Sequence, residues 1–129
     1  MSQKIVSVDM LKKFGEVQEW SGTSTGLSGR YVDLCSLTLE KGYVYEVNTY
    51  VTCDKAPNDT LYNNINATNC SGVTPNAGAW INYAGVASTN KATLRVDQGV
   101  DGVVWLKTYA YDKTATYTGY ITAHKIGLV

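Results

Sequence analysis

The feature that most constrains the fold is a strict two-residue alternation in the segment Tyr43–Cys53. Its odd positions carry tyrosine, valine, threonine and cysteine, whereas Glu46, Asn48 and Thr52 lie at even positions. Successive side chains of a β-strand point to opposite faces of the sheet. The pattern therefore predicts a long strand with one buried side.

Similar strand-like segments recur along the chain, joined by short turns such as Glu40–Gly42 and Asp97–Gly99. The predicted strands are Tyr31–Leu39, Ala79–Val86, Ala92–Asp97, Val103–Asp112 and Gly119–Leu128. The Asn- and Thr-rich segment Asp54–Ala77 predicts an extended loop, with one short strand near Leu61–Ile65. About six to eight strands without intervening helices favour an antiparallel sandwich or barrel and disfavour a parallel α/β sheet.

The N-terminal region differs from the rest of the chain. Met10, Leu11, Phe14 and Val17 lie on one stripe at helical spacing, which predicts a short helix in residues 1–20. The small residues of Ser21–Gly29 predict a flexible linker over residues 21–30. Residues 31–129 then form the β-domain.

Charge and composition limit the classes of partner. The chain has 11 basic and 11 acidic residues, without the Lys/Arg cluster that nucleic-acid binding requires. It also lacks the apolar core of a signal peptide and any run of about 18 apolar residues, so we expect synthesis in the cytosol without membrane insertion. Cys35, Cys53 and Cys70 favour reduced thiols, although two of them have the alternative of pairing.

Four segments together resemble the complement C1q/tumour-necrosis-factor (TNF) family of jelly rolls. They are LTLEKGYVYEVNTYVT (Leu37–Thr52), AWINYAG (Ala79–Gly85), ATLRVDQGVDGVVWLKTYA (Ala92–Ala110) and TYTGYITAHKIG (Thr116–Gly127). The Tyr117–Tyr120 motif, aromatic-x-Gly-aromatic, is the most specific of these matches. The resemblance implies an all-β, two-sheet antiparallel jelly-roll sandwich that assembles as a homotrimer.

The opening KIVSVDMLKKFGEV (Lys4–Val17) resembles the start of small tail or fibre proteins from phages of Gram-positive bacteria. The two resemblances together imply a phage or prophage structural protein in the virion, with a trimeric receptor-binding or tail-fibre head. Such a head would recognise a bacterial cell-surface glycan or protein, and its N-terminal segment would contact other virion proteins. The alternatives are a capsid-decoration or assembly protein without a receptor, and a small glycan-active hydrolase.

We expect the ligand contact in the predicted loop Asp54–Ala77 and the strand that follows it. Tyr62 offers a stacking face, and Asn63 and Asn64 offer paired donors and acceptors of the kind that sugar hydroxyls require. Trp80 and Asn82 follow directly. In the alternative interpretation the asparagines serve turns and Trp80 fills the core.

The final strand supplies the candidate trimer interface. One of its faces carries Tyr120, Thr122 and His124, and the opposite face carries Ile121, Ala123 and Lys125. Weakly charged, tyrosine-rich strand faces are typical of protein interfaces. We list Tyr120, Thr122 and His124 as the interface candidates, but the sequence does not decide which face meets the threefold axis.

No catalytic residue, metal site or cofactor is predicted. His124 would need one of the three cysteines beside it in space, and no local signature surrounds any of them. The carboxylates lie largely in predicted turns, where aspartate caps its own backbone. The segment Asp97–Asp101 offers two carboxylates to a calcium ion, but a plain turn is the preferred interpretation.

Overall fold

The computed structural model describes residues 16–25, 32–56, 58–82, 84–109 and 115–129. Within these ranges all regular elements are strands, and no helix there is long and apolar enough to cross a membrane. The eight strands are β1 (Val17–Thr25), β2 (Val32–Leu39), β3 (Tyr43–Cys53), β4 (Asp59–Thr68), β5 (Asn76–Ile81), β6 (Ala87–Arg95), β7 (Gly102–Tyr109) and β8 (Thr116–Leu128). The predicted all-β class is confirmed.

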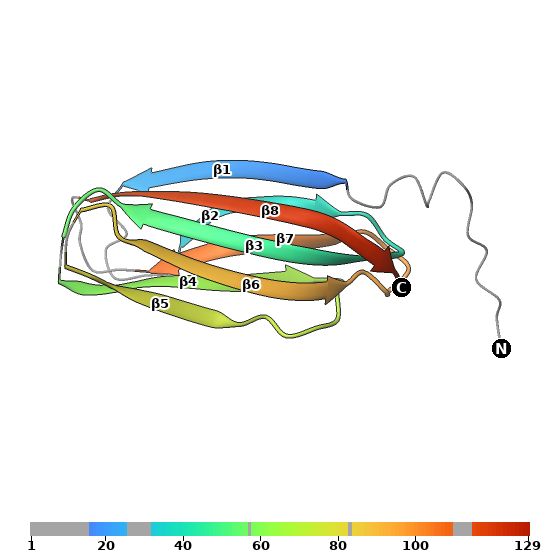
Figure 1. Cartoon of the computed structure of the whole chain (residues 1–129). Coiled ribbons are helices and arrows are strands. Elements are labelled where there is room, and N and C mark those ends of the chain that lie inside the picture. The colour runs from blue at the N-terminus through green and yellow to red at the C-terminus, as the bar shows by residue number, and fades with distance from the viewer. Residues whose placement is uncertain (1–15, 26–31, 57, 83, 110–114) are drawn as a thin grey trace.

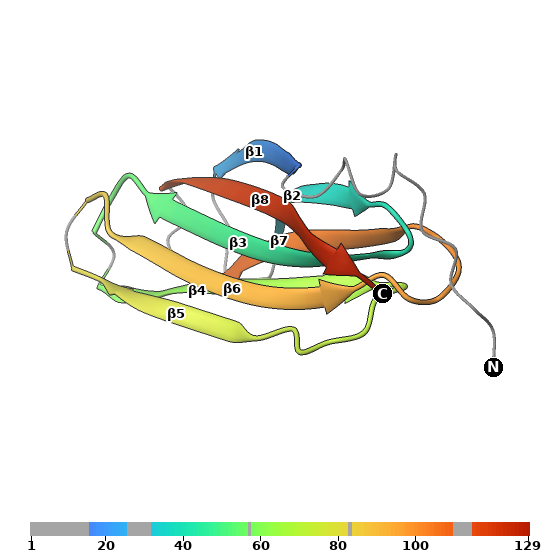
Figure 2. The same ribbon diagram turned by 45° about the vertical axis from the view of Figure 1, so that its right-hand side comes forward.

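The strands form two four-stranded antiparallel sheets, with the orders β1-β8-β3-β6 and β2-β7-β4-β5. Figures 1 and 2 show them as two layers whose strands run along one long axis. Strands adjacent in the sequence mostly lie in different sheets, so the chain crosses repeatedly between the layers. This arrangement is the predicted two-sheet jelly roll.

The alternation of side chains builds the core between the sheets. In β3 the odd positions are buried and the even positions are more exposed, as the sequence predicted. Tyr43, Tyr45 and Tyr117 are almost completely buried, and they pack with the inward leucines, isoleucines and valines of both sheets. Burial of these large rings is a main source of the sandwich's stability.

Two glycines permit the close approach of the sheets. Gly22 and Gly119 are register partners on β1 and β8. A Cβ on Gly22 would lie 1.8 Å from the carbonyl oxygen of Leu34, and one on Gly119 would lie 2.6 Å from a methyl of Leu106. The glycine of the Tyr117–Tyr120 motif is therefore a packing requirement of the sandwich.

The prediction for the N-terminal region needs correction where the structure describes it. Val17, assigned above to a helical stripe, begins β1, and Ser21–Thr25 of the predicted linker belong to the same strand. The rest of the predicted helix and linker, residues 1–15 and 26–30, lies outside the described residues. The sequence favoured a linker because small residues are typical of loops, but β8 provides β1 with a full ladder of partners.

The predicted loop Asp54–Ala77 is also wrong in large part. It contains the whole of β4, which pairs with β5 and β7, and the start of β5. The short strand expected near Leu61–Ile65 is confirmed but is twice as long, with ten residues. The abundance of asparagine concealed it, because asparagine favours turns in the absence of tertiary partners.

A buried lysine closes the end of the sandwich where β1 begins and β8 ends. The Lys125 side chain is only 4% exposed, and its Nζ donates to Glu40 Oε2 at 2.9 Å and to Glu16 Oε1 at 3.4 Å. Nζ also lies 4.5 Å from the centre of the Tyr43 ring. Burial acts to lower the pKa of Lys125, but the hydrogen bonds and charges around it outweigh burial and raise that pKa. The lysine therefore stays charged, and its ion pair with Glu16 links the residue before β1 to the rest of the sandwich.

Candidate functional site: two outer sheet faces

Each sheet has an outer face that the core does not use. We call the outer side of sheet β1-β8-β3-β6 the β8 face, and the outer side of sheet β2-β7-β4-β5 the β4 face. The β8 face is formed by Val17, Glu19, Ser21, Glu46, Asn48, Tyr50, Lys91, Arg95, Tyr120, Thr122, His124 and Ile126. The β4 face is formed by Asp33, Ser36, Thr60, Tyr62, Asn64, Asn66, Asn76, Trp80, Trp105 and Lys107.

Apolar surface on the β8 face is spread over three strands. Val17 is 51% exposed, Tyr120 and Ile126 are each 47% exposed, and Tyr50 is 40% exposed. Tyr50 and Tyr120 are register partners whose ring centroids lie 5.6 Å apart in a tilted arrangement. Exposed apolar groups of this size, gathered on one face, are typical of a protein interface.

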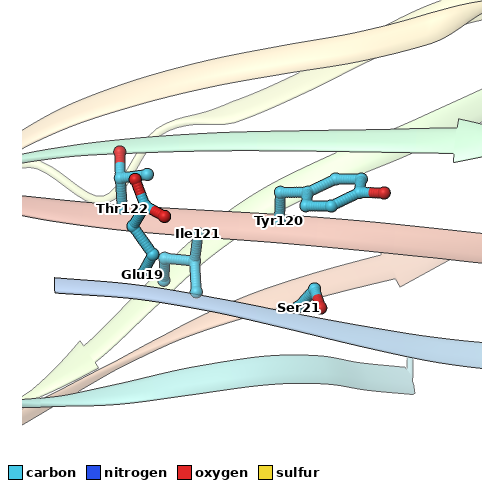
Figure 3. Close-up of a pocket in the computed structure, with 5 residues that line it drawn as sticks. All are labelled: Glu19, Ser21, Tyr120, Ile121 and Thr122. Carbon is cyan, nitrogen blue, oxygen red and sulfur yellow. The ribbon is translucent and has the colours of Figure 1, made fainter.

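Tyr120 stands between two hollows of the β8 face. The first, of about 470 Å³, is lined by Glu19 and Ser21 of β1 and by Tyr120 and Thr122 of β8, with Ile121 between them (Figure 3). The second, of about 230 Å³, lies on the side of β3 and β6 and includes Tyr50. The Tyr120 ring is therefore a ridge flanked by depressions, a shape that suits interlocking contact.

Charges on the β8 face are distributed across its width. Glu19 lies on the edge strand β1, whereas Lys91 and Arg95 lie on the opposite edge strand β6. Between them, Glu46 accepts a hydrogen bond from Asn48 and pairs with Lys91 at 3.5 Å. The Asn48 bond, followed by the Lys91 charge, lowers the pKa of Glu46. His124 is the register partner of Glu46 on β8.

The β4 face carries two exposed aromatic rings on neighbouring strands, Trp80 on the edge strand β5 and Tyr62 on β4. Trp80 is 57% exposed and Tyr62 is 37% exposed. Trp80 is the register partner of Thr60, and Tyr62 is the partner of Gly78 in the adjacent pair. A Cβ on Gly78 would lie 3.6 Å from the Tyr62 ring, so the glycine leaves room for that ring beside Trp80.

A polar row crosses the β4 face next to these rings. Asn64 is the register partner of Asn76 on β5 and of Lys107 on β7, and Lys107 is in turn the partner of Asp33 on β2. Lys107 and Asp33 form an ion pair at 3.7 Å. In the next row, on the side away from Tyr62, Trp105 on β7 is the register partner of Asn66 on β4.

Asn64 has a feature that internal packing does not explain. Its side chain lies on the outer face but is only 7% exposed, and among the described residues no donor is bonded to its Oδ1 atom. A buried acceptor without a donor costs about 1–3 kcal/mol. The oxygen has less than 1 Å² of accessible surface, so neighbouring atoms cover it and the outer face does not present it to a ligand.

Asn63, one residue earlier, lies on the opposite side of β4 and is completely buried between the sheets. Its Oδ1 accepts a hydrogen bond from Thr49 Oγ1 at 2.7 Å, and its Nδ2 donates to the carbonyl of Ser88 at 2.9 Å. Asn63 thus links β3, β4 and β6 from inside. Of the five predicted ligand residues, Tyr62, Asn64 and Trp80 share the β4 face, with Tyr62 in the register row between the other two. Asn63 lies on the opposite side of β4, and Asn82 is exposed just beyond the end of β5.

Sequence reasoning missed several members of the β4 face, including Asn66, Asn76, Trp105 and Lys107. The two-residue alternation puts Trp105 and Lys107 on the same side of β7, so that part was accessible from the sequence. Their position beside Asn64 and Asn66 depends on the pairing of β7 with β4, which joins segments about forty residues apart.

The groups considered for catalysis do not converge. His124 lies on the β8 face, whereas Cys35 and Cys53 are buried in the core, and Cys35, Cys53 and Cys70 form no disulfide. Burial raises the pKa of the Cys35 thiol to about 11, which disfavours the nucleophilic thiolate. Cys70 follows the end of β4, and its Sγ donates a hydrogen bond to the carbonyl of Thr68 at 3.2 Å.

The Asp97–Asp101 segment is held by protein contacts. Asp97 accepts a hydrogen bond from Ser71 and pairs with Arg95, while Asp101 accepts one from the Lys41 backbone at 2.9 Å. In the described part of the chain, no group of three or more His, Cys, Asp or Glu side chains is arranged to hold a metal ion. These contacts support the interpretation of a structural turn.

No family model and no curated protein matches the chain. Among solved structures, the chain is similar to the globular domain of zebrafish complement 1qA protein, with a TM-score of 0.54 and 14% identity over 84% of this chain and 97% of that chain. The chain has the C1q-like jelly-roll fold. It is also similar to the tripod from the baseplate of bacteriophage Tuc2009, with a TM-score of 0.45 and 8% identity over 97% of this chain and 71% of that chain. The resemblance in the sequence is therefore confirmed at the level of the fold.

Proposed function

We propose that this chain is a non-enzymatic phage or prophage structural protein whose trimeric head recognises a bacterial cell-surface glycan or protein. The head would assemble through the β8 face and bind its ligand through the β4 face. Its position in the virion rests on the resemblance of the Lys4–Val17 segment to phage tail and fibre proteins, and the trimer rests on the resemblance to C1q/TNF domains.

The single observation that carries the binding function is the pair of exposed rings, Trp80 and Tyr62, on the β4 face. The two residues stand in adjacent register rows of the paired strands β5 and β4. Aromatic rings with one exposed side and a few fixed polar groups are typical of ligand sites. Since strands hold them, the site needs little ordering when a ligand binds.

The assembly function is supported by the exposed apolar residues and the charges of the β8 face. Tyr120 and Tyr50 form an exposed ridge with hollows on either side. In a closed ring of identical copies, one edge of each copy contacts a different edge of the next copy. A contact that joins the β1 edge to the β6 edge brings Glu19 opposite Lys91 and Arg95, which is electrostatically favourable.

The experiment that tests the binding function compares attachment of purified protein to Gram-positive cells before and after substitution of the aromatic rings. We expect Trp80→Ala to weaken attachment about tenfold or more, and Tyr62→Ala to weaken it less, because each ring contributes stacking area. Both variants should keep their melting temperature and oligomeric mass, since the two rings lie outside the core.

Val73→Ala is the matched control. Val73 is 78% exposed in the connection between β4 and β5, outside both faces, so its removal should leave attachment unchanged. Attachment that survives Trp80→Ala and Tyr62→Ala together would contradict recognition at the β4 face. That result would favour the alternative of a capsid-decoration or assembly protein without a receptor. Release of sugar from wall polysaccharide by the unmodified protein would instead favour the alternative of a glycan-active hydrolase.

A further inference from the structure

The strand β5 forms one edge of its sheet, and in the described part of the chain no strand pairs with its outer rim (Figures 1 and 2). The carbonyl of Pro75, directly before β5, accepts a hydrogen bond from the Ile65 N–H at 3.2 Å and so points toward β4. In an antiparallel sheet, the N–H and C=O of one residue point to the same side, and the side alternates along the strand. Asn76, Gly78 and Trp80 therefore direct their backbone groups to the open edge.

The other three edge strands carry features that protect an edge from pairing with another chain. Natural sheets use charged side chains, prolines and bulges for this purpose. β1 carries Glu19, and β6 carries Lys91. The pairing of β2 shifts register between Asp33 and Cys35. β5 has the sequence NAGAWI, without charge or proline, and its register with β4 is continuous, so it is the edge that is open to a further strand.

A glycine makes room for a side chain of such an added strand. Gly78 is exposed, with Tyr62 of β4 on one side of it in the register row and the open edge on the other. Because Gly78 has no side chain, a large apolar residue opposite it can reach over the glycine to the Tyr62 ring. Trp80, which is 57% exposed in the adjacent row, covers the same residue from the side.

These features together indicate the chemistry of the partner. Along the open edge every second residue, about 6.8 Å from the last, presents both a donor and an acceptor. An extended polypeptide presents its own donors and acceptors at the same repeat, so it can satisfy the whole edge. Since β5 carries no charge, main-chain hydrogen bonds and apolar contacts hold the partner, and charge is not required.

From these observations we propose that the β5 edge binds an extended polypeptide segment, which pairs antiparallel with Asn76–Trp80 and places a large apolar side chain opposite Gly78. The segment belongs to a bacterial surface protein, and the Tyr62 and Trp80 rings contact its outward side chains. The proposed ring contact joins the β1 and β6 edges of the other sheet, so it makes no use of β5. This inference rests on the proposed function and names the class of its ligand.

Titration of the full chain with the capped peptide Lys-Thr-Val-Leu-Val-Thr-Lys tests strand addition, because its central leucine can lie opposite Gly78. An N-methyl group on the leucine removes a donor that faces β5, so it should weaken binding about tenfold or more. An N-methyl group on the first valine, whose N–H faces away from β5, is the matched control and should change the dissociation constant less than about threefold. Equal binding of the two N-methylated peptides, or no binding of the unmodified peptide up to about 5 mM, would overturn the proposal.

Substitutions on the protein test the position of the added strand. Gly78→Lys fills the place beside Tyr62 and puts a charge on the edge, so it should abolish peptide binding. Because a Cβ on Gly78 would lie 2.9 Å from a methyl of Thr60, Asn76→Lys serves as a second variant at a side chain that is already exposed, and it should weaken binding about tenfold. Thr89→Lys on the β6 edge is the matched control and should leave binding unchanged. Thermal melting checks that each variant is folded, and unaltered binding by both β5 variants would overturn the proposal.

Treatment of cells separates this inference from the proposed function. Protease digestion of Gram-positive cells should abolish attachment, whereas periodate, which oxidises sugar diols, should leave it unchanged. Attachment that is lost with periodate, survives protease and still depends on Trp80 would leave the proposed function standing with a glycan ligand and would overturn this inference. Attachment that depends on neither Trp80 nor Tyr62 would contradict recognition at the β4 face itself.

Discussion

The β8 face and the β4 face belong to two sheets of the same size and the same antiparallel pairing, yet they differ in how their polar groups are satisfied. On the β8 face, Glu46 is engaged by Asn48 and Lys91, and the exposed apolar residues extend from Val17 to Tyr50. On the β4 face, the exposed rings gather near Trp80, and a polar row with one unpartnered acceptor lies beside them. We propose the first face for contact with another copy and the second for ligand binding.

The comparison teaches that residue composition by itself does not separate the face proposed for assembly from the face proposed for ligand binding. Both faces carry exposed tyrosine and several asparagine or threonine residues. Each face also has a tyrosine opposite a tyrosine in the register, Tyr50 with Tyr120 and Tyr62 with Tyr109. What differs is the neighbour on the other side, which is Thr89 for Tyr50 and Gly78 for Tyr62.

The largest expected effect would come from a charge in the middle of the β8 face. Tyr120→Arg should convert a trimer, with three times the 14.0 kDa chain mass, to monomer, because each contact would bury an unpaired cation. Light scattering at micromolar concentration measures the mass. Trp80→Arg, the matching change on the β4 face, should leave the mass unaltered. If Trp80→Arg gave a monomer and Tyr120→Arg did not, the β4 face would be the assembly face. If the unmodified chain were itself a monomer, the proposed trimer would be wrong.

A second prediction separates the inside of the β4 strand from its outside. Asn63→Ala should lower the free energy of unfolding by about 2–3 kcal/mol, because it leaves the Thr49 hydroxyl and the Ser88 carbonyl without their partner. Asn64→Ala removes an oxygen that has no donor, so it should lower the free energy of unfolding by less than Asn63→Ala does. Denaturant unfolding of the two variants measures the difference. Equal losses would mean that the Asn64 side chain stabilises the fold as much as that of Asn63.

The smallest effect concerns the acid response of the β8 face. The pKa of Glu46 lies below its ordinary value of 4.5 because of the Asn48 hydrogen bond and the Lys91 charge. A carboxylate with a lowered pKa stabilises the folded state above its unfolded pKa, and this contribution is lost as the pH falls through the folded value. Glu46→Gln should therefore melt slightly earlier than the unmodified chain at pH 7, and the gap should close below pH 4.5.

Thermal melting between pH 7 and pH 3 at low salt measures that gap, with Asp33→Asn on the β4 face as the comparison. High salt should reduce the Glu46 effect, since the carboxylate is exposed and its charge interactions are screened. A gap that widens on acidification would contradict the assigned direction of the pKa shift.

The sequence by itself determined the local alternation of side chains. The bounds of β3, Tyr43–Cys53, followed from it directly, and so did the two opposite sets of residues in β8. Alternation is a property of one pleated strand, so a single segment suffices to reveal it. The same reasoning failed for β1 and β4, whose small residues and asparagines favour loops until a neighbouring strand supplies their backbone partners.

The tertiary structure alone decided which side of each strand faces outward and which residues meet there. In β8 it turned Ile121, Ala123 and Lys125 inward and left Tyr120, Thr122 and His124 on the surface. In β4 it buried Asn63 and left Asn64 on the outer face, although the two residues are chemically identical. The physical reason is that burial depends on the opposing sheet, and cross-strand neighbours depend on pairing between segments distant in the chain. Local patterning fixes the period of a strand, whereas long-range pairing assigns its faces.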